Sequence, residues 1–463
     1  MENPMAGSRS FATHRALLYK IGTIVLLALA SFVPLRMVDD LVAERRGLRD
    51  GVVRDVARMG TGAQRLEGIV LILPCTDHYE EKETLDNGRT VVRSRTAVCD
   101  RYLLPERLGI DGELETELRY RGIYPALVYR SRLALDGVFS VPVSVPPPGM
   151  RRTWGTPQLA LGIADVRGIR SAPVLQWNGA AAPFESGAGK APWAQGIHAD
   201  VRVDPALGGQ ASFTLELDLA GMEHFQVVPA AGEVTTSLRS SWPHPSFVGR
   251  FSPRARTVND AGFEAAWHTS DLSSNVRQAF RRCLNGQCDD YLNSAFGVSL
   301  IQPVDVYQRT YRALHYGIVF VALTFALFFL YEIVSGLRMH PVQYALVGIA
   351  LLAFFVLLLA FAEHVGFGAA YLIAAGACIG LVGSYVRYTL GTRARAAALM
   401  ALLGGLYAAL YTVLGSEDYA LLMGALLLFA ALAAFMLITR RLDWYALPGS
   451  RLPDSPKART AMP

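Results

Sequence analysis

The feature that most constrains this chain is a series of apolar runs, each about 20 residues long. A helix of this length crosses a hydrocarbon core of roughly 30 Å. Five such runs follow one another in the last third of the chain, near residues 316–336, 342–362, 366–386, 396–414 and 419–438. Because a chain inside a bilayer must satisfy its own backbone hydrogen bonds, these runs predict a bundle of transmembrane α-helices.

A sixth apolar run lies near the N-terminus, from Ile21 to Leu35, and extends to about residues 16–38. A cleaved signal peptide is one interpretation, because Ala28-Leu29-Ala30 resembles a cleavage site. However, the run continues past that site, and apolar residues then recur at near-helical spacing through residues 39–59. We therefore favour an uncleaved anchor that continues as a helical stalk, with cleavage as the alternative.

The charged residues that flank the apolar runs predict the topology. Basic residues follow the second, fourth and sixth runs, whereas the short loops after the third and fifth runs carry only acidic charge. The basic residues are Arg338, Arg387, Arg393, Arg395, Arg440 and Arg441, and the acidic ones are Glu363, Glu417 and Asp418. Since short cytoplasmic loops collect Lys and Arg, this alternation predicts that both termini are cytoplasmic and that the long segment after the anchor is outside the cytoplasm.

The segment between the anchor and the second span has the texture of a β-rich domain. Short β-prone runs are separated by Gly, Pro and Asp, for example at 68–74, 114–120, 139–146 and 212–220. Many short strands with turn residues between them are typical of a β-sandwich. The small-residue stretch 179–192 is predicted to be a loop. The expected domains are a cytoplasmic tail with anchor (1–38), a periplasmic β-rich domain with a stalk (39–313), a five-helix bundle (314–441) and a cytoplasmic tail (442–463).

Four of the five cysteines lie in the segment predicted to be exported. An oxidising compartment favours disulfides, and four cysteines allow three connectivities. Closeness in sequence favours the pairs Cys75–Cys99 and Cys283–Cys288, with free, partly buried thiols as the alternative. A zinc site is disfavoured, because no C-x2-C spacing occurs and no histidines cluster nearby.

Composition and motifs argue against several classes of function. The net charge of +5 comes largely from segments that flank the spans, so it does not indicate nucleic-acid binding. The sequence lacks G-x-S-x-G, H-E-x-x-H and G-x-x-x-x-G-K-[ST], and no G-x-G-x-x-G follows a strand. No catalytic residue, metal site or cofactor is therefore predicted, and enzymatic activity stays an open question with the balance against it.

Two constellations in the membrane part are candidates for function. Glu363 and His364, at the outer end of the third span, combine a carboxylate and an imidazole that could relay protons or hold a ligand. The alternative is a solvated interfacial pair, which costs little. Glu332 and His340 lie near the inner end of the second span, where Glu332 is expected to reach the interface or to pair with Arg338.

A third constellation lies in the exported domain, at Trp242-Pro243-His244-Pro245. The two prolines make the loop rigid and extended, because proline restricts its own backbone and that of the residue before it. An aromatic-flanked histidine such as His244, beside Trp242, could bind a ligand. The simpler interpretation is a structural corner.

Several longer segments resemble the CreD family of inner-membrane proteins. They are LVAERRGLRDGVVRDVA (41–57), RYRGIYPALVY (119–129), LGIADVRGI (161–169), SSWPHPSFVGRF (240–251), FGVSLIQPVDVYQRTYRALHYGIVFVALTFALFFLYE (296–332), HPVQYALVG (340–348) and AFAEHVGFGAAYL (360–372). The resemblance covers most of the chain, while the last two spans match in hydrophobicity alone. It implies an inner-membrane protein with a large periplasmic domain, linked to envelope integrity, colicin tolerance and a two-component response. It supplies no catalytic residues, and the Cys283–Cys288 stretch departs from the family pattern.

Two functions are consistent with these observations. In the first, the periplasmic domain binds an envelope protein or a cell-wall or lipid component, and the bundle anchors it in the lipid bilayer. In the second, the protein is a membrane enzyme or transporter that acts on a lipid-linked or amphipathic substrate through Glu363 and His364. Transporters place polar groups near the bilayer midplane, and the spans from 342 to 438 have almost no ionisable residue at their centres. We therefore favour the first function; the oligomeric state is left open.

Overall fold

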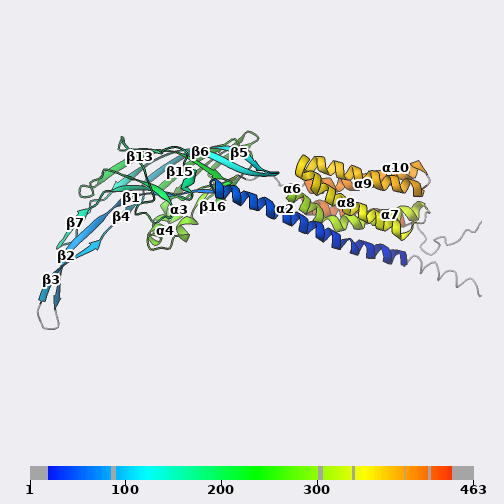
Figure 1. Cartoon of the computed structure of the whole chain (residues 1–463), viewed down its shortest axis with the longest axis horizontal. Coiled ribbons are helices and arrows are strands. Elements are labelled where there is room, and N and C mark those ends of the chain that lie inside the picture. Colours follow the sequence, from blue (N-terminus) through cyan, green and yellow to red (C-terminus); the bar gives the residue numbers. More distant parts are fainter. Residues whose placement is uncertain are drawn as a thin grey trace, which may run out of the picture. The chain divides into compact units, whose positions relative to one another are not determined.

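The computed structural model of the chain describes residues 19–84, 90–300, 306–335, 339–390, 392–415 and 419–440. These residues form two compact units. The helical unit combines the N-terminal residues up to Leu48 with those from Val304 onward, and the β-rich unit runs from Arg49 to Pro303. Figure 1 shows the helices and the strands of the two units. The expected combination of a membrane helix bundle and a β-rich, sandwich-like domain is confirmed.

Six helices in the described part of the chain are long and apolar enough to cross a membrane. The first is the segment Tyr19–Met59, which includes α2 (Phe32–Met59). The others are α7 (Gly317–Ser335), α8 (Pro341–Val365), α9 (Phe367–Leu390), α10 (Arg393–Gly415) and α11 (Ala420–Thr439). Their bounds match the predicted spans to within a few residues. The sequence analysis did not separate α6 (Val306–His315), a short amphipathic helix that precedes α7.

Aromatic side chains fill the interior of the helical unit. The ring of Phe354 on α8 lies 4.9 Å from that of Tyr407 on α10 and 5.3 Å from that of Tyr371 on α9. The two tyrosine hydroxyls are satisfied inside the bundle: Tyr371 donates to the Tyr407 carbonyl at 2.7 Å, and Tyr407 donates to the Cys378 sulfur at 3.0 Å. These contacts join α8, α9 and α10 without charged groups.

The β-rich unit contains three sheets. The β1 sheet has the strand order β11 (Glu185–Ser186), β12 (Gly196–Asp200), β8 (Gln158–Ile163), β1 (Gln64–Leu73), β14 (His224–Val227), β19 (Phe296–Leu300) and β16 (Pro245–Gly249), with β4 (Arg101–Leu103) also paired to β1. The β6 sheet has the order β10 (Ala180–Ala182), β9 (Val174–Trp177), β13 (Gly209–Met222), β6 (Tyr124–Val141), β5 (Arg107–Arg121), β15 (Glu233–Ser240), β18 (Gly262–Ser270) and β17 (Ala255–Asn259). The small β2 sheet has the order β3 (Thr90–Val98), β2 (Cys75–Thr84) and β7 (Met150–Trp154).

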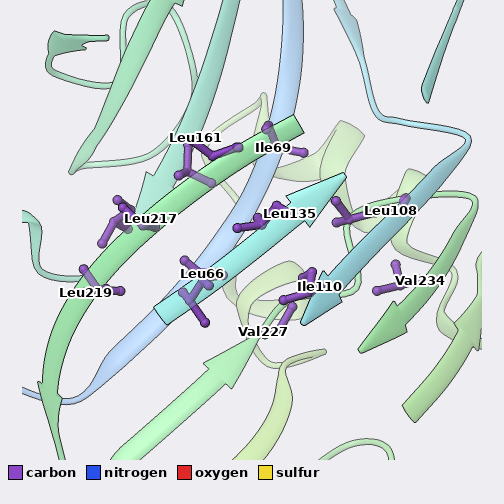
Figure 2. Packing of buried hydrophobic residues seen from close by; sticks show 14 of the residues in the cluster. Leu66, Ile69, Leu108, Ile110, Leu135, Leu161, Leu217, Leu219, Val227 and Val234 are labelled. Carbon is purple, nitrogen blue, oxygen red and sulfur yellow. The ribbon is translucent and has the colours of Figure 1, made fainter. Parts of the chain in front are cut away.

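The β1 sheet is covered on both faces, which explains why its central strand is a continuous apolar run. Ile69 and Leu71 of β1 pack in one core with residues of the β6 sheet, such as Leu135 and Leu217 (Figure 2). Val70 points to the other face, into a second cluster formed with the helices α4 (Val276–Cys283) and α5 (Asp289–Leu292). A strand that is buried on both sides loses the alternation of a half-exposed strand. The unit is thus a sandwich with an added helical layer.

The β6 sheet alternates in burial, so its second face is exposed and charged. On β6, Leu133 and Leu135 are buried while Arg130 and Arg132 are exposed. Arg130 forms an ion pair with Asp218 on β13, and Arg132 forms one with Glu115 on β5. Cross-strand pairs of opposite charge are typical of a solvated sheet face.

Three local predictions for this unit were incomplete. The stretch 179–192, expected to be a loop, contains the short strands β10 and β11, which extend the edges of two sheets. The run 139–146 is a strand only up to Val141, where β6 ends. The three short helices α3 (Asp271–Ser274), α4 and α5 were not predicted, because each is too short to show a helical repeat clearly.

Candidate functional site

Glu332 on α7 is buried in a cluster of hydrogen bonds within the helical unit. Lys20 of the N-terminal helix donates to one carboxylate oxygen, and the Met339 backbone N–H donates to the same oxygen at 2.9 Å. The Tyr344 hydroxyl donates to the other oxygen at 2.7 Å. The Lys20 ammonium also donates to the Met339 carbonyl at 2.8 Å. Both carboxylate oxygens are therefore occupied, which is how a buried charge is accommodated.

The structure gives Glu332 an ion-pair partner that the sequence did not suggest. The sequence pointed to Arg338, which lies outside the described residues, whereas the structure supplies Lys20 from the other end of the chain. His340 has a separate role, because its Nδ1 accepts from the Val342 N–H at 3.3 Å and its own N–H donates to the Gln343 side chain. His340 thus caps the N-terminus of α8, whose first N–H groups lack helical partners.

Glu363, near the end of α8, belongs to a second cluster in the same unit. Its side chain is 9% exposed, accepts a hydrogen bond from the Tyr307 hydroxyl at 3.0 Å, and lies 3.9 Å from the Arg45 guanidinium. Arg46 donates to the Tyr307 carbonyl at 2.9 Å and stacks on the Tyr311 ring at 4.7 Å. The Glu363 carboxylate is therefore held by α2 and α6.

His364 does not join this cluster. Its neighbour Glu363 is partly buried, but His364 is exposed at the end of α8. Successive residues on a helix point in different directions, so adjacency in sequence does not bring the imidazole and the carboxylate face to face. The structure thus favours a packing role for Glu363 over a relay between the two residues.

The two clusters share a pattern: a basic residue of the N-terminal helix pairs with an acidic residue of the C-terminal bundle. Lys20 pairs with Glu332, and Arg45 pairs with Glu363. At about 1.5 Å per residue, the helix between Lys20 and Arg45 is roughly 38 Å long. This length is close to the thickness of a bilayer that includes its interfacial regions. The pairs therefore tie the first helix to the bundle near both ends of the spans.

The Trp242–His244 loop joins β15 to β16 in the β-rich unit. Trp242 is partly buried and packs against the core of the sandwich, and its N–H donates to the Ser240 hydroxyl at 3.2 Å. His244 is exposed and lies edge-on to the Trp242 ring, with the ring centroids 6.2 Å apart. Pro245 then begins β16, which pairs with β19. These contacts are those of a structural corner.

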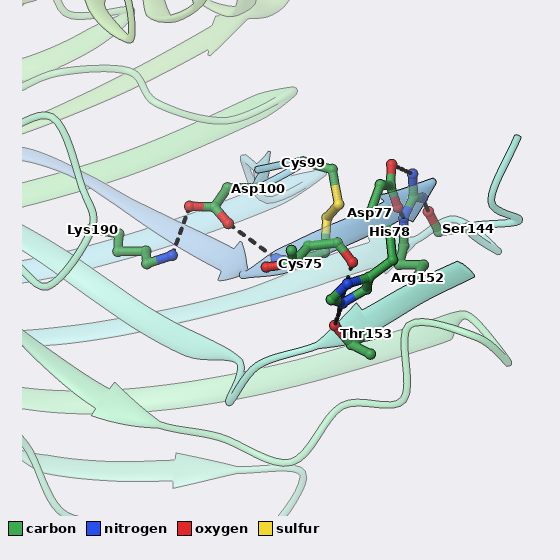
Figure 3. The surroundings of a disulfide bond; sticks show 10 residues. Cys75, Asp77, His78, Cys99, Asp100, Ser144, Arg152, Thr153 and Lys190 are labelled. Atoms are coloured by element: carbon green, nitrogen blue, oxygen red, sulfur yellow. Dashed lines mark hydrogen bonds and ion pairs between the residues drawn. A yellow bond between two sulfur atoms is a disulfide. The ribbon is translucent and has the colours of Figure 1, made fainter. Parts of the chain in front are cut away.

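The structure contains the two disulfides that closeness in sequence favoured. Cys75–Cys99 joins the start of β2 to the residue that follows β3 (Figure 3). Beside it, the Asp77 carboxylate accepts two hydrogen bonds from Arg152 on β7, each 2.7 Å long. This guanidinium lowers the pKa of Asp77. The disulfide and the ion pair together fix the base of the β2–β3 hairpin.

The second disulfide, Cys283–Cys288, links the end of α4 to the residue before α5. Cys283 is buried in the cluster between these helices and the β1 sheet. The fifth cysteine, Cys378, is free and buried in α9. In the described residues, no group of His, Cys, Asp and Glu is arranged to hold a metal ion.

Sequence reasoning missed a cavity of about 620 Å³ in the β-rich unit. Its lining comes from the end of α2, from β5, β6 and β13, and from the segment after the 3-10 turn Val166–Gly168. The residues are Val56, Gly60, Thr61, Glu115, Thr116, Glu117, Arg119, Val128, Tyr129, Arg130, Arg170, Ala220 and Gly221. They are spread over more than 150 positions of the chain, so no local motif could reveal them.

The cavity lies beside a well-ordered junction within the same unit. Arg167 donates to the carbonyl of Arg58 at 2.7 Å, near the end of α2, and also pairs with Asp165. Asp165 in turn accepts from the Gly62 N–H at 3.1 Å. The hydrogen bonds from Arg167 lower the pKa of Asp165. These contacts hold the lining residues Gly60 and Thr61 in place.

Comparison with known proteins agrees with the observed architecture. The family model described as inner membrane protein CreD matches residues 16–445. The inner membrane protein CreD of Escherichia coli (strain K12) is 33% identical over 446 residues, which cover 96% of this chain and 97% of that protein. The match extends over the anchor, the β-rich unit and the helix bundle. The chain therefore belongs to the CreD family of multi-pass inner membrane proteins.

Proposed function

We propose that this protein supports the integrity of the cell envelope and its response to stress through binding by its β-rich unit. In this proposal the β-rich unit lies in the periplasm and binds an envelope protein or a cell-wall or lipid component. The helical unit anchors it in the inner membrane, with both termini cytoplasmic. The sequence resemblance to the CreD family and the alternating charges of the short loops support this arrangement.

One observation carries the proposal: in the described part of the helical unit, the buried Glu332 and the partly buried Glu363 are both engaged by partners from that unit. Glu332 has Lys20, Met339 and Tyr344, and Glu363 has Tyr307 with Arg45 nearby. Partners within the bundle compete with a substrate for the carboxylate oxygens; they occupy both oxygens of Glu332 and Oε1 of Glu363. The helical unit thus has the features of an anchor, which leaves the β-rich unit as the place for binding.

The decisive experiment is rescue of a deletion strain by Glu363→Gln and His364→Ala, scored as survival under detergent or β-lactam stress with matched membrane levels. The glutamine oxygen still accepts from Tyr307, and His364 is exposed, so both variants are expected to fold and to rescue fully. Failure of rescue by folded, inserted variants would place the activity in the bundle. That result would favour a membrane enzyme or transporter.

The orientation has its own test, in which single cysteines react with a membrane-impermeant maleimide. Leu272 in the β-rich unit is 99% exposed and Tyr388 at the end of α9 is 90% exposed, so cysteine at either position is accessible on its own side. We expect the maleimide to label Leu272→Cys in cells whose outer membrane is permeabilised. We expect it to label Tyr388→Cys only after the inner membrane is lysed. The parent chain, whose free Cys378 is buried, is the control. The opposite labelling pattern would reverse the proposed topology.

A further inference from the structure

We infer that the cavity beside the end of α2 binds the phosphate group of a phosphate ester, with Arg170 as the residue that holds it. The inference rests on the proposed function, because it names the class of ligand that the β-rich unit would take. The cavity, of about 620 Å³, is far larger than a phosphate ion. The cavity has the size of a small-molecule site, so we expect the phosphate to be attached to an organic group that fills the rest of the space.

The charges around the cavity leave Arg170 as the surplus cation. Arg130 pairs with Asp218 through two parallel hydrogen bonds, and Arg119 pairs with Glu117 at 3.3 Å. Glu115, the other acid of the lining, pairs with Arg132. Arg170 is the arginine of the lining that has no carboxylate within ion-pair distance among the described residues.

The backbone of Arg170 is held beside β13, while its side chain is exposed. Its N–H donates to the Asp218 carbonyl at 3.0 Å, and the preceding residue, Ile169, forms a bridge with Leu219 of β13. The pKa of Asp218 is lowered chiefly by its hydrogen bonds from Arg130, and the charge of Arg170 adds a smaller effect in the same direction. An exposed guanidinium that forms no ion pair with a described carboxylate is free to form two parallel hydrogen bonds with phosphate oxygens.

The other lining residues fit an organic group that is mostly polar and has some apolar surface. Thr61 and Thr116 supply hydroxyls, Glu115 and Glu117 supply acceptors for hydroxyl or amine groups, and Val128 supplies apolar contact. A glycerol or sugar body esterified to phosphate offers such hydroxyls. A purely apolar ligand would cover the Arg170 guanidinium and the Thr61 and Thr116 hydroxyls without giving them hydrogen bonds, at high cost.

A second cavity of the same unit serves as an internal comparison. It measures about 410 Å³ and is lined by Glu113, Glu115 and Glu264, with Arg239 as its basic residue. Glu113 and Glu115 share one partner, Arg132, and Arg239 pairs with Asp111. Acidic charge therefore remains in excess in this lining and repels a phosphate. The two cavities thus differ in the sign of their excess charge, and the cavity with Arg170 is the one that favours an anion.

The phosphate ester has two possible sources, a lipid headgroup or a soluble metabolite, and the probes separate them. The full chain in dodecyl maltoside micelles, which contain no phosphate, is titrated by calorimetry with glycerol phosphate, with short-chain phosphatidylglycerol and with inorganic phosphate. Saturable binding of either ester supports the inference, and the tighter ester identifies the source. Binding of inorganic phosphate alone, or of no probe, overturns it.

The matched variants are Arg170→Gln and Arg281→Gln. Arg281 is an exposed arginine of α4 that is not part of the lining, so its loss should leave the affinity unchanged. Arg170→Gln should weaken binding of the ester by about tenfold or more, the size expected for a lost charge-assisted hydrogen-bond pair. Arg170→Lys, which keeps the charge but not the bidentate geometry, should recover part of the affinity. Equal losses in the Arg170→Gln and Arg281→Gln variants would overturn the inference.

The binding result is separable from the rescue result. If no probe binds through Arg170 while Glu363→Gln and His364→Ala still rescue, the phosphate inference fails and the proposed function stands. If Arg170-dependent binding is measured but these two variants fail to rescue, the phosphate inference is supported. The proposal that the bundle acts as an anchor is then contradicted.

Discussion

The Lys20 ammonium and the Glu332 carboxylate form an ion pair across 312 positions of sequence. The pair joins the first helix of the chain to the end of α7. The Glu332 side chain is 8% exposed and that of Lys20 20%, so the contact is largely shielded from solvent. The pair therefore joins the N-terminal helix to the bundle within the helical unit.

Breaking this pair from one side should destabilise the helical unit. Lys20→Met leaves the Glu332 carboxylate buried without its countercharge, at a cost of roughly 3 kcal/mol. Adding Glu332→Gln removes that charge while keeping an acceptor for Tyr344, so the double variant should be more stable than Lys20→Met alone. Thermal unfolding of the purified protein in detergent measures both. Glu44→Gln, an exposed acid on the same helix, should change stability by about 0.5 kcal/mol or less.

The outcome that contradicts this assignment is a strictly additive pair of substitutions. Additivity is expected for residues that do not interact, whereas residues in contact show a coupling energy. A coupling near zero would mean that Lys20 and Glu332 are not partners in the membrane.

The membrane spans were predictable because they depend on local composition alone. Runs of apolar residues determine where α7 to α11 lie, whatever their neighbours are. The partner of Glu332 was not predictable, since nothing in the sequence around Lys20 indicates which distant acid it meets. The same holds for the cavity, where Val56, Arg119, Arg170 and Ala220 converge from separate elements. Long-range contacts of this kind depend on tertiary packing and not on local sequence patterns.

The two disulfides should contribute unequally to stability. Cys75 and Cys99 are 24 positions apart, whereas Cys283 and Cys288 are 5 apart. A longer loop loses more entropy in the unfolded chain when it is closed, so the first bond should contribute about 3.5 kcal/mol and the second about 2 kcal/mol. Replacing each pair with serine and comparing the unfolding midpoints tests this. A larger loss from the Cys283–Cys288 pair would show that local strain or packing outweighs loop closure.

Acid should destabilise the β-rich unit through three paired carboxylates. The pKa values of Asp77, Asp165 and Asp218 are each lowered, chiefly by hydrogen bonds from Arg152, Arg167 and Arg130 respectively. Their usual pKa is about 3.8, so the folded protein holds these protons less tightly than the unfolded chain does. The resulting stability is fully present above pH 3.8 and is lost as the pH falls through the lower folded values.

The measurement is the unfolding midpoint of the purified protein as the pH is lowered from 7 toward 3. We expect these three groups to leave the midpoint nearly unchanged down to about pH 4, and the midpoint to fall steeply below that pH. Asp165→Asn removes one of the three groups. The unfolding midpoint of this variant should be lower at pH 7 and should fall less steeply as the pH is lowered. An unchanged acid slope in the variant would contradict the role assigned to Asp165.

Gly68 should be among the positions of the β-rich unit least tolerant of substitution. It lies at a register shift in β1, with a φ of 121° that L-residues rarely adopt. A Cβ there would lie 2.5 Å from the Tyr291 hydroxyl, which donates to the Glu67 carbonyl. Gly68→Ala therefore adds backbone strain and displaces a buried hydrogen bond, for a loss of about 3 kcal/mol or more.

Gly122 provides the matched control for this substitution. It also has a positive φ, of 63°, but a Cβ there would meet nothing within 4 Å. Gly122→Ala should therefore cost about 1 kcal/mol from the backbone conformation alone. The difference between the two variants, measured by thermal unfolding, reports the contacts with Tyr291 and Ala230 together with the added backbone cost of a φ of 121°. If the two losses are equal, β1 can shift away from Tyr291, and the bulge is not the rigid point of contact between the β1 sheet and α5.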